Sequence, residues 1–235
     1  SGFMGYSYSQ DDQNMCFNAA KNWQLGWYSD RHVDISVDGT FNGNLYGITT
    51  YTTTSANEKM IVRINDPACS TCDIYVSFNH DSGFNSDTGE GQNRVMVHTK
   101  QERPNVYKQS YVVAKLASGS AHVAMINGKP TGINVLNINA TANPAYATVL
   151  IGCMNDGQCE EGDLCTTNTC NVTTNQCEAP VDVTCSNDGD VCNGHDVCNR
   201  SNGQCETLTV EEYCDDGNPV SYAFGGEMRR GSVLA

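Results

Sequence analysis

The stretch Asp73-Ile-Tyr-Val-Ser-Phe-Asn79 is short and rich in β-branched and aromatic residues, which is the composition of a β-strand. Five further segments between residues 34 and 152 share this character, and most of them alternate apolar with polar residues: Lys59 to Asn65, Arg94 to His98, Tyr111 to Ala117, Ile133 to Ile138 and Ala147 to Ile151. Turn clusters of Gly, Asn, Asp and Pro separate these segments. The pattern predicts an antiparallel β-sandwich over residues 34–152.

Charge and cysteine are distributed unevenly along the 235-residue chain. Of the net charge of −14, residues 1–150 contribute −2 (12 acidic against 10 basic) and residues 151–235 contribute −12 (15 against 3). Ten of the 13 cysteines lie between Cys153 and Cys214. Two kinds of polypeptide are therefore joined, and so acidic a chain is a poor candidate for binding nucleic acid. We also expect no membrane span, because no segment carries the roughly 18 to 20 apolar residues that a spanning helix needs.

A cysteine-rich repeat module is predicted for residues 153–214. This segment has few large apolar residues, so disulfides have to replace a hydrophobic core. The sequence from Cys159 to Glu178 aligns with that from Cys185 to Glu206, with matched cysteines 26 to 28 positions apart. A third copy begins at Cys214 and loses its cysteines, so residues 215–235 are expected to form a divergent or disordered tail.

Two metal-binding interpretations of this module are less favoured. Zinc sites usually contain closely spaced Cys-x2-4-Cys pairs, and the neighbouring cysteines here lie further apart, except for Cys165 and Cys170. The turns Asn155-Asp-Gly157 and Asn187-Asp-Gly-Asp190 offer oxygen ligands for calcium, but they lack an alternating Asp-x-Asp-x-Asp pattern. Asn, Asp and Gly are also the ordinary residues of tight turns.

Many disulfides indicate an oxidising compartment, and we therefore expect a secreted, extracellular glycoprotein. Three sequons agree with secretion and make Asn139, Asn171 and Asn199 candidate glycosylation sites. Cys69-Ser-Thr-Cys72 has no βαβ context, so a structural disulfide is favoured over a redox pair. His80, His98 and His122 lie in or next to strands without partners at metal-ligand spacing, and we interpret them as structural or exposed.

A helix is predicted from Gln13 to Leu25. Asp11-Asp12 is a candidate N-cap pair, and Gly26 stands where a C′ residue would. Met15, Ala19 and Trp23 recur at i, i+4 spacing and so lie on one face of this helix.

The run Met4-Gly-Tyr-Ser-Tyr-Ser-Gln-Asp-Asp12, followed by Met15-Cys-Phe-Asn-Ala-Ala-Lys-Asn-Trp-Gln-Leu-Gly-Trp-Tyr-Ser-Asp30, resembles the gametolysin family of metzincin zinc metallopeptidases. The similarity covers the Met-turn and the helix after it, and continues more weakly through Tyr75 to Asn79, Glu90 to His98 and Tyr111 to Leu116. The cysteine repeats lie outside it. The resemblance implies a secreted metalloendopeptidase that carries zinc and acts by proteolysis on glycoproteins of a cell wall or extracellular matrix.

The same resemblance assigns roles to three residues of the Met-turn. Met4 would support the zinc ligands from below, and Gly5 would permit the tight turn. Tyr6 matches a tyrosine that in some metzincins stabilises the oxyanion, although a buried tyrosine that only packs the turn is the commoner arrangement. The zinc ligands themselves are missing, because the chain contains no His-Glu-x-x-His. We therefore expect this chain to hold no metal and to be inactive alone, with the zinc helix preceding residue 1.

Four segments follow from these observations. Residues 1–33 would be the C-terminal end of an α+β catalytic domain, residues 34–152 the sandwich, residues 153–214 the repeat module and residues 215–235 the tail. Without the zinc helix, the apolar face formed by Met15, Phe17, Trp23 and Trp27 is expected to be uncovered. Two functions remain open: the C-terminal part of a secreted zinc metalloendopeptidase, or an extracellular adhesive or matrix-binding protein with a relic peptidase segment.

Overall fold

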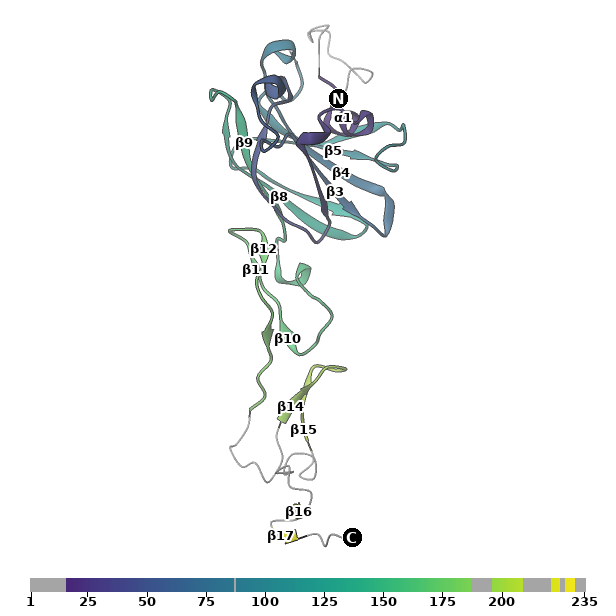
Figure 1. The fold of residues 1–235 in the computed structure, drawn as a ribbon, viewed down its shortest axis with the longest axis vertical. Coiled ribbons are helices and arrows are strands. Elements are labelled where there is room, and N and C mark those ends of the chain that lie inside the picture. Colours follow the sequence, from purple (N-terminus) through teal and green to yellow (C-terminus); the bar gives the residue numbers. More distant parts are fainter. Residues whose placement is uncertain (1–15, 87, 187–195, 209–220, 225–226, 231–235) are drawn as a thin grey trace. The chain divides into compact units, whose positions relative to one another are not determined.

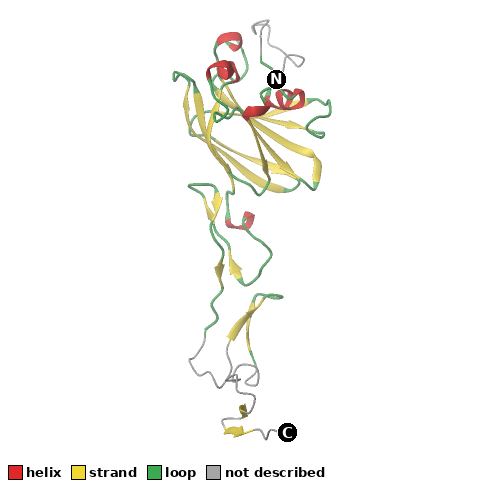
Figure 2. Ribbon diagram, viewed as in Figure 1, coloured by secondary structure: helices red, strands yellow, loops and turns green. Residues whose placement is uncertain are grey.

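The computed structural model is mainly β, as the sequence predicts (Figures 1 and 2). It describes residues 16–86, 88–186, 196–208, 221–224 and 227–230. The chain divides into two compact units, the first comprising residues 1–159 with 170–177 and the second residues 160–169 with 178–235. The division therefore runs through the cysteine-rich segment and does not coincide with its beginning.

The first unit contains two sheets. The five-stranded sheet has the order β1-β3-β4-β5-β6, with β1 His32–Ser36, β3 Ile61–Asp66, β4 Cys69–Asn79, β5 Arg94–Lys100 and β6 Ser110–Leu116. The four-stranded sheet has the order β2-β9-β8-β7, with β2 Phe41–Tyr46, β7 Ala121–Ile126, β8 Lys129–Asn139 and β9 Tyr146–Gly152. Three 3-10 turns lie in the connections: η1 Ser29–Arg31, η2 Ile48–Thr53 and η3 Gly83–Asn85.

Both sheets contribute to one apolar core, which confirms the sandwich. Val76 of β4 and Val97 of β5 meet Val135 of β8 and Val149 of β9 in a single buried cluster. Removing such side chains from water is the main favourable term in folding. The six strands expected from the sequence are all present, with bounds shifted by a few residues.

Two details depart from the prediction. The sheets are not wholly antiparallel, because β1 pairs with β3 in parallel, from His32 opposite Ile61 to Ser36 opposite Asn65. Strands β1, β2 and β7 were also not predicted, since they are short and carry Asp, Asn, Gly or Ala. Strand β7 is joined to β8 by Asn127 and Gly128, both at positive φ, which is the geometry of a two-residue hairpin turn.

Helix α1 (Ala19–Leu25) is shorter than predicted. Its N-cap is Asn18, whose side-chain Oδ1 accepts a hydrogen bond from the Lys21 backbone N–H at 3.1 Å, so residues 16–18 are not helical. The expected cap at residues 11 and 12 lies outside the described residues. The predicted C-terminus is confirmed, because Gly26 adopts φ +69° directly after the last helical residue.

The helix packs on the outer face of the five-stranded sheet. Ala19 and Ala20 are fully buried in a cluster with Met60, Ile61 and Tyr75. Trp23 stacks on His32 with ring centroids 4.2 Å apart and meets Tyr75 edge-on at 5.9 Å. The expectation of an uncovered apolar face is therefore wrong for Trp23, which the sandwich covers, and Met15 lies outside the described residues. Trp27 is still about half exposed, beside Phe17.

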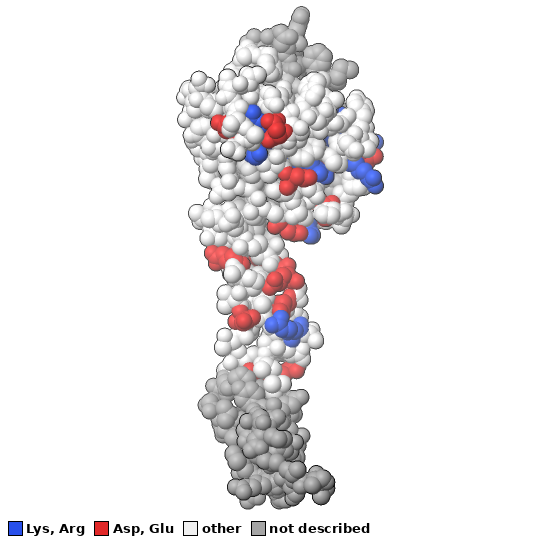
Figure 3. Space-filling view, in the orientation of Figure 1, with Lys and Arg blue, Asp and Glu red and all other residues white. Residues whose placement is uncertain are grey.

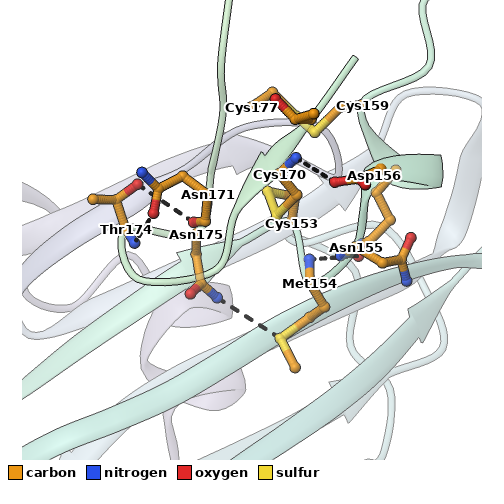
Figure 4. Close-up of a disulfide and its surroundings, with 12 residues drawn as sticks. Cys153, Met154, Asn155, Asp156, Cys159, Cys170, Asn171, Thr174, Asn175 and Cys177 are labelled. Carbon is orange, nitrogen blue, oxygen red and sulfur yellow. Dashed lines mark hydrogen bonds between the residues drawn. A yellow bond between two sulfur atoms is a disulfide. The ribbon is translucent and has the colours of Figure 1, made fainter. Parts of the chain in front are cut away.

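The beginning of the cysteine-rich segment belongs to the sandwich unit. A short hairpin, β11 Cys170–Asn171 with β12 Gln176–Cys177, is tied by the disulfides Cys153–Cys170 and Cys159–Cys177, next to the 3-10 turn η4 Asp156–Gln158 (Figure 4). The Asn175 backbone C=O accepts a hydrogen bond from Cys153 N–H at 3.1 Å. A Cβ on Gly152 would lie 2.0 Å from that carbonyl oxygen, so only glycine fits there.

The second unit repeats this arrangement. Its described strands are β10 Thr166–Thr167, β13 Val181–Asp182, β14 Asp196–Asn199, β15 Gln204–Thr207, β16 Ser221–Phe224 and β17 Glu227–Arg230. The β14–β15 hairpin is tied by Cys165–Cys198 and Cys185–Cys205. Cys198 lies opposite Cys205 in the strand register of this hairpin, as Cys170 lies opposite Cys177 in the first hairpin. With Cys69–Cys72 there are five disulfides among the described residues, which confirms the predicted disulfide module.

The sheet face under α1 contains a buried ion pair that the sequence did not single out. The Arg63 guanidinium binds Asp73 through Nε at 3.0 Å and Nη2 at 3.1 Å, and the Asp73 side chain is 2% exposed. Tyr75 Oη–H donates to the same carboxylate at 3.0 Å. A third contact joins Arg63 Nη1 to Asp34 at 2.9 Å, but that carboxylate is 48% exposed.

We expect Asp73→Asn to lower the free energy of unfolding by about 3 kcal/mol, because it leaves the Arg63 charge without its buried partner. Asp34→Asn is the matched control, since it removes an exposed carboxylate from the same guanidinium and should cost less than about 1 kcal/mol. Urea unfolding followed by tryptophan fluorescence measures both, and equal losses would show that burial of the pair is unimportant.

Candidate functional site

A pocket lies on the outer face of the five-stranded sheet, beside the start of α1. The C-terminal half of β4, the middle of β5, the loop between these strands, the beginning of η2 and residues 16–18 all line it. The sequence places polar side chains here because this face of the sheet points away from the apolar core. Ser77, Asn85, Thr88 and His98 are nevertheless buried, and the other polar side chains that line the pocket are partly exposed.

Amide side chains build one wall of the pocket. Asn85 is 3% exposed, and its Nδ2 donates to Asn79 Oδ1 at 2.8 Å and to the His80 backbone C=O at 2.9 Å. Thr88 Oγ1–H donates to Asn85 Oδ1 at 2.7 Å, and Cys16 N–H reaches the same oxygen at 3.4 Å. Asn79 Nδ2 in turn donates to the backbone C=O groups of Glu90 and Gly91. This network holds the loop after β4 in one conformation.

His98 of β5 is the most unusual residue of the pocket. Its side chain is buried, and neither ring nitrogen has a hydrogen-bond partner among the described residues. Burial lowers the pKa of His98 to about 3, while the Glu90 carboxylate acts in the opposite direction. The imidazole is therefore neutral near pH 7 and offers one N–H donor and one lone pair to the pocket.

His80 lies on the other side of the pocket in a chain of hydroxyl groups. Its Nδ1 accepts a hydrogen bond from Ser82 Oγ–H at 2.9 Å, and its Nε2–H donates to the Ala140 backbone C=O at 3.1 Å. Thr49 Oγ1 lies 3.0 Å from Ser82 Oγ. A Cβ on Gly47 would lie 2.5 Å from His80 Cβ, so a glycine at this position lets the two segments approach.

Cys16 has a free thiol that also lines the pocket. Burial raises the pKa of Cys16 to about 12, so the thiol is protonated at neutral pH. It is therefore neither a strong nucleophile nor a metal ligand in this environment. The pocket as a whole can hold a small polar group by hydrogen bonds, and the Glu90 carboxylate also lines it.

The residues predicted from the Met-turn, Met4, Gly5 and Tyr6, lie outside the described residues. Their roles therefore stay predictions.

The three sequon asparagines are described, and each lies at the end of a strand before a turn. Asn139 Oδ1 accepts from Thr141 Oγ1–H at 3.2 Å, Asn171 Oδ1 from Thr173 N–H at 3.0 Å and Asn199 Oδ1 from Ser201 N–H at 2.8 Å. All three are partly exposed. Asn171 and Asn199 occupy equivalent positions in the two repeated hairpins, because each follows the first cysteine of its hairpin.

One group of potential metal ligands occurs in the part of the chain that the structure describes. The sulfur atoms of Cys153, Cys159 and Cys170 lie within 4.8 Å of one another. All three form disulfides, and a disulfide sulfur cannot supply the thiolate that zinc requires. The residues of this group therefore do not fit a zinc site.

Acidic side chains dominate the cysteine-rich segment. On the face that Figure 3 shows, they outnumber basic ones along the described part of that segment. Arg200 forms an ion pair there with Asp163. None of the described helices is long and apolar enough to cross a membrane.

Comparison with protein-family models, curated proteins and solved structures found no match for this chain.

The sequence did not predict the pocket. Its residues come from five segments spread between positions 16 and 98, and no pair of them has the spacing of a known motif. The run of apolar residues around His98 could only indicate that this histidine is buried.

Because the folded pKa of His98 is below its value in the unfolded chain, roughly 6.5, the unfolded state takes up a proton first as the pH falls. The stability contributed by the neutral imidazole is complete above that value and is lost progressively toward pH 3. Between pH 7 and pH 5 we expect a loss of about 2 kcal/mol from this residue.

Urea unfolding at several pH values, comparing the wild type with His98→Gln, isolates this contribution. The variant should lose less stability on acidification. Met96→Leu, on the same face of β5 but without a titratable group, should keep the wild-type pH dependence. The same acid sensitivity in wild type and His98→Gln would contradict the assignment.

Proposed function

We propose that this chain is the C-terminal part of a secreted zinc metalloendopeptidase that acts on glycoproteins of a cell wall or extracellular matrix. The observation that carries the proposal is the resemblance of residues 4–30 to the gametolysin family. Helix α1 (Ala19–Leu25) lies within this run, and Gly26 of the run directly follows the helix.

The packing of α1 shows how the peptidase-like segment joins the sandwich. Ala19, Ala20 and Trp23 are joined to Tyr75 and His32 of the sandwich. Residues 16–30, the described part of the peptidase-like segment, are therefore packed into the sandwich unit. In such an enzyme the sandwich would act as a support for the end of the catalytic domain, and the cysteine module would bind substrate or anchor the enzyme to the matrix.

Five disulfides agree with an oxidising compartment, as secretion requires. Zinc would be held by the histidines of a His-Glu-x-x-His helix encoded upstream of Ser1. The Glu of that helix would act as the general base. Tyr6 would act as a hydrogen-bond donor to the oxyanion, and Met4 and Gly5 would shape the turn below the metal.

The alternative function is that of an extracellular adhesive or matrix-binding protein with a relic peptidase segment. The described residues bring together no metal-ligand group other than disulfide-bonded cysteines, which both functions predict for this chain. The coding sequence immediately upstream discriminates the two. His-Glu-x-x-His with a third His supports the enzyme, and an unrelated sequence or a start codon supports the binding protein.

The purified chain should contain only background zinc and should not cleave a matrix glycoprotein, because it lacks three or four zinc donors. Metal analysis and a proteolysis assay measure both. The protein expressed with its upstream sequence should hold one zinc per chain and lose activity with a chelator. One tightly held zinc in the chain alone, with chelator-sensitive proteolysis, would refute the assignment of the metal site to the upstream region.

Cys16 provides a second test. It is free, while Cys69 and Cys72 bond each other. If the chain is the end of a larger catalytic domain, an unreduced digest of the secreted protein should recover Cys16 bridged to a peptide that precedes Ser1, because leftover cysteines in secreted proteins usually have a partner. Recovery of Cys16 as a free thiol, or bridged within residues 1–235, would remove this support.

A further inference from the structure

Each sheet of the sandwich has two edge strands, and three of the four edges are blocked. Strand β1 carries Asp34 in its centre. Strand β2 is partly covered, because Lys59 forms an isolated β-bridge with Leu45. Strand β6 carries Lys115, and its register with β5 is interrupted at Val97 and His98. Charges, irregular pairing and covering segments are the usual means by which proteins prevent an edge strand from pairing with another chain.

The fourth edge, β7, has none of these features. Its sequence, Ala121-His-Val-Ala-Met-Ile126, contains no Lys, Arg, Asp, Glu or Pro. It pairs with β8 over all six residues without a shift in register. No described strand pairs with its other side. The backbone N–H and C=O groups on that side are therefore available to an added strand.

The side chains of β7 also fit an added strand. Ala124 and Ile126 point into the core and are buried, whereas Val123 and Met125 lie on the outer face and are 45% and 60% exposed. An extended peptide beside β7 would place its alternate side chains against these two residues. Because β7 has no charge, the peptide positions that meet it should be apolar or β-branched.

We propose that the free edge of β7 binds an extended segment of a polypeptide by β-strand addition. A second copy of this chain is a less suitable occupant. A six-residue strand is about 20 Å long, so two copies joined through β7 alone would bury much less than the roughly 800 Å² per partner of a stable interface. An extended peptide can bind as a weak, transient ligand through the same main-chain hydrogen bonds, and such a ligand does not need the buried area of a stable dimer.

This inference names a substrate-docking surface for the proposed peptidase, and in that respect it rests on the proposed function. Binding itself requires neither zinc nor proteolysis. It is therefore measured on the chain as given, and a failure of binding leaves the test of the upstream zinc helix unaffected.

The test uses a fluorescein-labelled decapeptide of alternating Val and Thr, with binding followed by fluorescence anisotropy. A second peptide, N-methylated at every residue, has the same side chains but carries no backbone N–H on either edge, so it cannot form the ladder of hydrogen bonds. We expect the wild type to bind the first peptide at least tenfold more tightly than the second. Equal binding of the two would show non-specific apolar adhesion and overturn the proposal, as would no binding of either.

Val123→Lys with Met125→Lys places two charges on the outer face of β7 and should weaken binding at least tenfold. Val172→Lys is the matched control, because Val172 is an equally exposed apolar residue in the β11–β12 hairpin. It should bind within twofold of the wild type. Thermal unfolding verifies that each variant folds, and the single variant Met125→Lys serves if the double variant does not.

Sedimentation equilibrium completes the experiment. A monomer that binds the peptide supports the proposal. A dimer that dissociates in the β7 variant would show that a second copy occupies the edge and would overturn it.

Discussion

The structure depends on the burial of β4 on both of its faces. One face, with Ile74, Val76 and Phe78, lies in the core between the sheets, and the other, with Tyr75, lies under α1. A strand buried on both sides cannot leave a charge without a partner, because desolvation of an unpaired ion is costly. Asp73 therefore binds Arg63 and Tyr75, and Arg63 in turn lies over the ring of Trp23. The helix, the ion pair and the outer sheet face form one interdependent layer.

The pocket follows from the same constraint. Covering the outer face buries polar side chains of β5 as well, and His98 is left without a partner among the described residues. The amides of Asn79 and Asn85 satisfy each other and the neighbouring backbone, and so hold the loop after β4 in place. A rigid polar wall opposite an unsatisfied neutral imidazole suits a small uncharged polar group. It does not suit a zinc ion, because the donor atoms of His80, Glu90 and His98 do not converge as a ligand group would, although all three line the pocket.

The two hairpins of the cysteine-rich segment show how such a module is built without a hydrophobic core. In each, a residue at positive φ, Asn175 or Gly203, contacts the residue that precedes a cysteine. That residue is Gly152 for the first hairpin and Leu164 for the second, and the following cysteine bonds the first cysteine of the hairpin. The end of β9, the last strand of the sandwich, thus contacts the first hairpin in the way that the first repeat contacts the second hairpin. Asn175 reinforces the first junction, because its amide accepts from Asn134 of β8 at 3.0 Å and lies against Met154 (Figure 4).

The sequence by itself determined the β-rich class, six strands of the sandwich, the C-terminal end of α1 and the use of cysteine in disulfides. These features depend on local properties: β-branched composition, a glycine after a helix, and a segment too poor in apolar residues to form a core. Only the tertiary structure decided the parallel pairing of β1 with β3, the disulfide connectivity and the pocket around His98. Each of these depends on which segments distant in the sequence meet. The composition of β7, for example, contains nothing that marks an edge, and its free side became visible only once the order of the strands was known.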